Sequence, residues 1–169
     1  MQAINQITVF LNAGGPVLAL ILLLTILLCS LIAERYRFLK FDAQIMCAAA
    51  VQAWHIRTDK SSWFALQIRT ASIAQTKAAL EKNLSLIGLL IALCPMLGLL
   101  GTVSGMVSVF DVMAVTGTGN AREMASGISK ATLPTMAGMV ISLLGLYFRS
   151  RFNAMAKHHL AHFEDSLVK

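Results

Sequence analysis

Three long apolar runs without a single charged residue constrain this chain more than any other feature. They cover residues 16–33, 83–110 and 131–148. A helix needs about 20 mainly apolar residues to cross a hydrocarbon core about 30 Å thick, so each run is close to that length or exceeds it. Because 57% of the 169 residues are apolar and only 13% are charged, we predict an all-α polytopic membrane protein with three transmembrane helices that extend into the cytoplasm.

The distribution of basic residues predicts the topology. Residues 1–33 carry no Lys or Arg, residues 34–83 carry eight, and the tail from Arg149 carries four. The positive-inside rule places the two basic segments in the cytoplasm and the N-terminus outside. Topology therefore accounts for the net charge of +6, and no nucleic-acid partner is expected.

The apolar runs also predict the order of segments along the chain. Apolar residues recur at helical spacing before Gly14 and Gly15, which favours a short helix lying on the membrane surface. The expected segments are an outer-face amphipathic helix (1–14), a first transmembrane helix (15–34), a cytoplasmic helical segment (35–83), a second transmembrane helix (84–110), a periplasmic loop (111–130), a third transmembrane helix (131–149) and a cytoplasmic tail (150–169).

The cytoplasmic segment contains no proline or glycine, so we expect helices that continue the flanking spans. Polar residues cluster at 58–62 and predict a break there, with Trp54 and Trp63 packing across it. Within the second span, Pro95 removes one backbone hydrogen bond and predicts a kink or a local opening.

Glycines in the second and third runs predict close helix packing. The stretch LGLLGTVSGM, residues 97–106, places Gly98, Gly101 and Gly105 along one side of a helix. Small residues at such spacing let a neighbouring backbone approach inside lipid. With Gly138 of the third run, these glycines are the predicted helix-packing residues.

Hydroxyl side chains mark a second feature of the same helices. Thr102 lies in the second run, and Thr132, Thr135 and Ser142 fall near one face of the third. A hydroxyl stripe on an apolar helix faces protein or water more often than lipid. Hydrogen bonding between helices and the lining of a pore both remain open for this stripe.

The chain offers no group of residues suited to catalysis. No nucleophile is paired with a base, so an enzyme is not expected. His158, His159 and His162 lie close in sequence, but no nearby carboxylate or cysteine completes a metal-ligand set, and what they bind stays open. We expect neither a metal nor a cofactor.

Two stretches, GLLGTVSGMVSVF at 98–110 and GISKATLPTMAGMVISL at 127–143, resemble the ExbB/TolQ/MotA family of proton-channel subunits. The likeness is closest to a short ExbB of a TonB-type energy-transduction system. The resemblance implies a homo-oligomer, a pentamer, in the lipid of the bacterial inner membrane. It also implies two partners, an ExbD-like single-span protein that carries a membrane aspartate and a TonB-like protein.

By motif position, Thr102 and Thr135 correspond to the family's pore-lining threonines, and Ser142 lies in the same stripe. Lys130 stands where ExbB and TolQ have glutamate, so no proton-relay role is carried over to it. The three runs themselves contain no Asp, Glu or His, and a proton carrier within a membrane needs a titratable group. The resemblance therefore predicts a proton-driven ring that energises a TonB-like protein, with the proton-carrying aspartate supplied by the ExbD-like partner. A passive scaffold and a Tol-type motor subunit are the alternatives.

Overall fold

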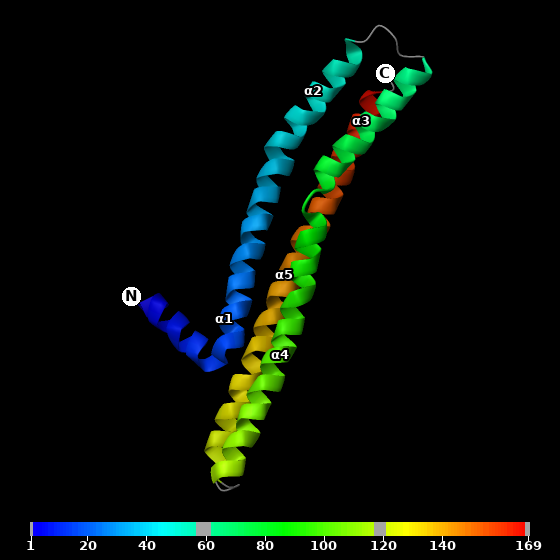
Figure 1. Ribbon diagram of the computed structural model, residues 1–169. Coiled ribbons are helices and arrows are strands. Elements are labelled where there is room, and N and C mark those ends of the chain that lie inside the picture. Colours follow the sequence, from blue (N-terminus) through cyan, green and yellow to red (C-terminus); the bar gives the residue numbers. More distant parts are fainter. Residues whose placement is uncertain (1, 57–61, 117–120, 168–169) are drawn as a thin grey trace. The chain divides into compact units, whose positions relative to one another are not determined.

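The computed structural model describes the backbone of residues 2–56, 62–116 and 121–167, and the side chains of 15–54, 56, 62–114 and 124–167 (Figure 1). Across these residues every regular element is helical and no strand is present. Three helical stretches, Gly15–Trp54, Trp63–Ala114 and Met124–Ser166, are long and apolar enough to cross a membrane. The predicted all-α membrane fold with three spans is therefore confirmed. The elements are α1 (Gln2–Arg37), the π-helical turn η1 (Phe38–Asp42), α2 (Ala43–His55), α3 (Trp63–Glu81), α4 (Leu84–Thr116) and α5 (Ala121–Ser166).

The chain divides into two compact units. Unit 1 comprises Met1–Cys29 and Gly88–Leu146, and unit 2 comprises Ser30–Ile87 and Tyr147–Lys169. Unit 1 therefore holds parts of α1, α4 and α5, and unit 2 holds α2, α3 and the remaining ends of the long helices.

In unit 1, α4 and α5 run side by side (Figure 1) and the span of α1 packs against them. In the described part of α1 that belongs to unit 1, the buried residues are Leu18, Ile21, Leu24 and Leu28. Their spacing of three and four residues places them on one helix face. The backbone of α1 leaves helical geometry at Gly15, where φ is 67° and ψ is −167°, a left-handed conformation that glycine adopts without a Cβ clash.

The structure differs from the expected periplasmic loop at 111–130. The helix α4 continues to Thr116 and α5 begins at Ala121, so most of that segment is helical. Residues 117–120 lie outside the described chain. The flanking residues 111–116 and 121–126 contain neither proline nor glycine, so no helix breaker stops either helix earlier.

The second span also passes through its proline without a break. The helix α4 is continuous from Leu84 to Thr116 with Pro95 inside it. The local opening expected at Pro95 is therefore not what the structure has. A proline inside a helix removes one backbone bond, and the tertiary contacts of α4 hold the helix together at that cost.

Unit 2 has a core of large side chains. Trp54, Phe163 and Leu167 pack together around Ala65 and are almost fully buried. Trp63, by contrast, is 65% exposed, and its ring meets that of Phe64 edge to face. We expected the two tryptophans to pack against each other, but Trp54 lies in the core and Trp63 is exposed.

The interruption between α3 and α4 was not expected from the sequence. The helix α3 ends at Glu81, Lys82 is extended with ψ 138°, and Asn83 has a left-handed φ of 64°. The break that we expected at 58–62 lies largely outside the described residues. Ser62 is described, and its side chain accepts a hydrogen bond from the Phe64 amide at the start of α3.

Candidate functional site

The contact between α4 and α5 is made by backbone atoms at two of the predicted packing glycines. A Cβ added to Gly98 would lie 2.8 Å from the Cα of Thr135, and one added to Gly138 would lie 2.5 Å from the carbonyl oxygen of Cys94. Real Cβ atoms do not approach other atoms that closely. The two helices therefore meet at a distance that only glycine permits at these positions.

The other two predicted packing glycines lie along the same contact. A Cβ on Gly101 would lie 2.6 Å from the Cβ of Pro134, and one on Gly105 would lie 2.6 Å from the Cβ of Ala131. All four glycines thus lie between α4 and α5. Small residues line both sides of the contact.

Two further glycines of α5 belong to the interior of unit 1 and were missed in the sequence. Gly127 faces the side chain of Val109, and Gly145 faces Ile91 and Leu28. A signal for them was present. The glycine at 138 has glycine partners 11 residues before it and seven residues after it, which places all three near one face of a helix.

Thr135 links the two helices by a hydrogen bond. Its Oγ1 donates to the carbonyl oxygen of Gly98 across the contact, at 3.0 Å. The side chain of Thr135 is half-buried in the chain. Of the two roles that the sequence left open for this hydroxyl, the bond between helices is the one present within a single chain.

The remaining hydroxyls of the stripe have other surroundings. Thr102 is half-buried and its Oγ1 donates to the carbonyl of Leu99 in its own helix, at 2.7 Å. Thr132 is exposed and bonds likewise to Ser129, at 3.0 Å. Ser142 is buried, with 8% of its surface exposed. The structure thus brings Thr135 to Gly98 and leaves Thr102 bonded along α4.

The outer faces of α4 and α5 are made of large apolar side chains, whereas a water-soluble domain has mainly polar side chains on its surface. These residues are more than half exposed. Contiguous apolar surface of this kind is covered by lipid or by another protein chain. Its members in the middle of the two helices are Leu99, Leu100, Val103, Val107, Met136, Met139, Val140, Leu143 and Leu144.

Charged groups bound the charge-free runs within these helices. Asp111 on α4 and Lys130 on α5 are both exposed, and the helix residues 131–148 that follow Lys130 carry no charge. Within the described residues, no group of three His, Cys, Asp or Glu side chains is placed to hold a metal ion. The rings of His158 and His159 are 6.2 Å apart.

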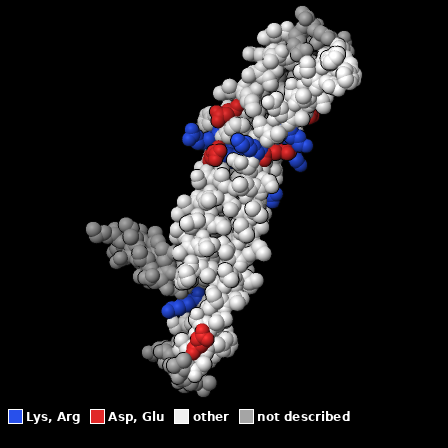
Figure 2. All heavy atoms as spheres, in the orientation of Figure 1, with Lys and Arg blue, Asp and Glu red and all other residues white. Residues whose placement is uncertain are grey.

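Unit 2 holds most of the described charged side chains, and eight of them lie in two short stretches, at 34–42 and 77–82. Figure 2 shows Lys and Arg side chains gathered with Asp and Glu side chains in one band across the visible face. Mixed charge of this kind suits the boundary between lipid headgroups and water, where charged ends of long side chains remain hydrated.

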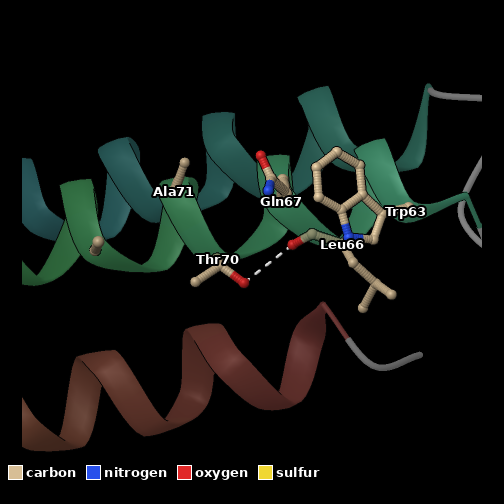
Figure 3. A pocket seen from close by; sticks show the side chains of 6 residues that line it. Trp63, Leu66, Gln67, Thr70 and Ala71 are labelled. Carbon is tan, nitrogen blue, oxygen red and sulfur yellow. Dashed lines mark hydrogen bonds between the residues drawn. The ribbon is translucent and has the colours of Figure 1, made fainter.

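A shallow groove runs along α3 in unit 2 (Figure 3). Thr70 lies in it and donates a hydrogen bond to the carbonyl of Leu66, at 3.0 Å. The residues that line the groove include no acid, base or thiol, so they offer no catalytic chemistry. They are Trp63, Leu66, Gln67, Thr70, Ala71 and Ala74.

Comparison with known proteins identifies similar sequences. Residues 40–165 match the model of the MotA/TolQ/ExbB proton channel family. A biopolymer transport protein named ExbB-like 1, from Synechocystis sp., is 39% identical over 72 residues, which are 41% of this chain and 28% of that protein. ExbB-like 3 from the same organism is 32% identical over 94 residues, which are 54% of this chain and 44% of that protein. The matches thus cover less than half the length of either relative.

Proposed function

Because the chain belongs to the MotA/TolQ/ExbB proton channel family, we propose that it is a ring-forming subunit of a proton-driven motor in the bacterial inner membrane. In this proposal several copies, five by family resemblance, surround the membrane helices of a second protein. The N-terminus is periplasmic and the C-terminus is cytoplasmic, in accord with the basic residues at 34–83 and in the tail.

One observation carries the proposal: the membrane runs of this chain contain no carboxylate or imidazole, the side chains that take up and release a proton most readily near neutral pH. Residues 16–33, 83–110 and 131–148 include no Asp, Glu or His. A proton that crosses the hydrocarbon region needs a titratable side chain or a continuous path of water. The proton carrier is therefore supplied by a partner, an ExbD-like single-span protein with an aspartate at membrane depth.

The hydroxyl groups give this ring its part in the mechanism. Thr102, Thr135 and Ser142 supply polar atoms at the depth where the carboxyl group of the partner would lie. The Thr102 hydroxyl, bonded to Leu99 of its own helix, and the Thr135 hydroxyl, bonded to Gly98 of the neighbouring helix, can exchange those bonds for bonds to that carboxyl group or to water. The proton motive force supplies about 2.3 kcal/mol per charge for each 100 mV, which would drive protonation changes that shift the partner helices within the ring.

The output in this proposal is the energising of a TonB-like protein for uptake through the outer membrane. The two Synechocystis sp. relatives are named as biopolymer transport proteins, which supports a role in transport. The family also includes TolQ and MotA, so a Tol-type motor subunit is the second candidate. Energy-dependent uptake and envelope integrity, measured in a strain that lacks this chain, distinguish the two outputs.

The decisive test neutralises the acid of the partner. This chain is co-expressed with its ExbD-like protein in wild-type form and with the membrane aspartate changed to asparagine, and energy-dependent uptake is measured. The proposal expects loss of uptake while the two proteins still co-purify. Normal uptake with the asparagine variant would show instead that the ring is a passive scaffold.

A further inference from the structure

Arg35 is a buried cation of unit 2 that the proposed motor does not use. It lies near the end of α1 with 4% of its surface exposed. Its Nη2 donates to the carbonyl oxygen of Ala79, at 2.8 Å, and also to that of Leu80. The guanidinium carbon lies 4.7 Å from the centre of the Phe38 ring. A long polar side chain is thus fixed against the last turn of α3.

The two carbonyl groups that Arg35 binds are those that the interruption of the helix leaves free. In an uninterrupted helix, the Ala79 carbonyl would accept from the Asn83 amide and the Leu80 carbonyl from the Leu84 amide. Instead α3 ends at Glu81, and the Ile87 amide donates to Asn83 at 2.9 Å as α4 begins. The guanidinium therefore takes the place of two lost backbone donors.

The side-chain pattern across the interruption is that of one continuous helix. Thr76, Leu80, Leu84 and Ile87 are all buried, and their spacing of four, four and three residues is that of a single helix face. Residues 76–87 contain neither proline nor glycine. Asn83 favours the interruption, since asparagine tolerates a left-handed backbone better than most residues. The segment is thus compatible with both an interrupted and a continuous helix.

From these contacts we infer that Arg35 is a latch: it holds α3 and α4 apart as two helices, and its release joins them through residues 82 and 83. A junction of a few residues at the end of an element can absorb a large change of backbone angles. The interrupted junction would bend under a pull along α4, whereas the joined helix would transmit it to α3. This inference does not depend on the motor that we propose.

Amide hydrogen exchange on the full-length chain in mild detergent tests the latch. The measurement follows peptides that cover residues 77–90 in the wild type and in Arg35→Gln. In the interrupted form the Asn83 and Leu84 amides lack helical acceptors, and in the joined form they are bonded. We expect exchange of residues 83–86 to slow by about tenfold in Arg35→Gln, equivalent to about 1.4 kcal/mol.

Two matched variants control this measurement. Arg37→Gln removes the same charge from an exposed position two residues along α1, and its exchange should equal that of the wild type. Arg35→Lys keeps a donor for the two carbonyl groups, so it should hold the two helices apart and show wild-type exchange. Unchanged or faster exchange in Arg35→Gln would overturn the inference, because the turn would then fray or hold without Arg35.

Variants of Asn83 decide the matter if Arg35→Gln does not fold. Asn83→Ala disfavours the left-handed backbone and should slow exchange of residues 83–86, whereas Asn83→Gly favours that backbone and should not slow it. Both variants retain Arg35. Equal exchange in the two variants would show that the junction has a single stable form, and the latch would be rejected.

Discussion

Each of the two units of this chain has its own kind of internal packing, and the two kinds are opposite. In unit 1, α4 and α5 meet through Gly98 and Gly138, with backbone atoms facing backbone atoms. In unit 2, Trp54 and Phe163 fill the core with two of the largest side chains of the chain. On α4 and α5 of unit 1 many large apolar side chains face outward, whereas unit 2 buries Trp54 and Phe163 in its core.

This difference reflects the solvent on each side. Lipid tails are as apolar as leucine, so burying a leucine between two membrane helices gains little, and close van der Waals packing of small residues holds the helices together. In water, burial of large apolar side chains is the main favourable term. The contrast supports a membrane location for unit 1 and a largely aqueous location for the Trp54 cluster.

The largest expected effect is the loss of a large side chain from unit 2. Phe163→Ala should destabilise the unit by about 3–5 kcal/mol, because Phe→Ala in a core leaves a cavity; Phe163 is 1% exposed. Phe64→Ala makes the same change at a side chain that is 69% exposed and should cost less than about 0.5 kcal/mol. Trp54 fluorescence in a Trp63→Phe background reports unfolding. Equal losses in the two variants would remove the contrast between core and surface.

A smaller loss is expected from adding one methyl group to unit 1. Gly138→Ala should destabilise the α4–α5 contact by about 1–3 kcal/mol, the usual cost of overpacking, because the new Cβ would meet the Cys94 carbonyl. At Gly145 the new Cβ would meet a side-chain carbon of Ile91 instead of a backbone atom, so a smaller loss is expected there. Unfolding titrations in mixed micelles compare the two. A Gly145→Ala loss as large as that of Gly138→Ala would contradict a backbone contact specific to Gly138.

The smallest effect should come from one hydrogen bond. Thr135→Val removes the bond to Gly98 and should cost about 0.6 kcal/mol, the average for polar contacts between membrane helices. Thr135→Ser should keep the bond. Thr132→Val is the matched control, since the Thr132 hydroxyl bonds only along its own helix to Ser129. Unfolding titrations in mixed micelles measure both variants. Equal losses in Thr135→Val and Thr132→Val would show that the bond to Gly98 does not hold the helices together.

Much of unit 1 could be predicted from the sequence. Charge-free runs mark its spans, because charged side chains are costly in lipid. Gly98 and Gly138 pointed to the contact that the structure contains, because small residues at helical spacing have few other uses inside a membrane. The pattern did not decide what Thr135 would bind, since a hydroxyl can bond to its own helix, to another helix or to water.

The features that could not be predicted depend on contacts between distant residues. The interruption at Asn83 was missed because the apolar spacing continues through it, and the carbonyls there are bonded by Arg35, 44 residues before Ala79 in the chain. The extension of α4 beyond Asp111 was missed because this first charge after the apolar run was taken as the end of the helix. Trp63 was expected to pack against Trp54 across the break at 58–62, and the sequence does not show which of the two tryptophans fills a core.

The most direct test of the account measures proton flux into vesicles that contain this chain alone, under an imposed potassium diffusion potential. Its membrane runs carry no acid, so we expect no flux above that of empty vesicles, and flux only when a single-span partner with its membrane aspartate is added. A voltage-driven flux through the chain alone would contradict the claim that this ring takes its acid from another protein.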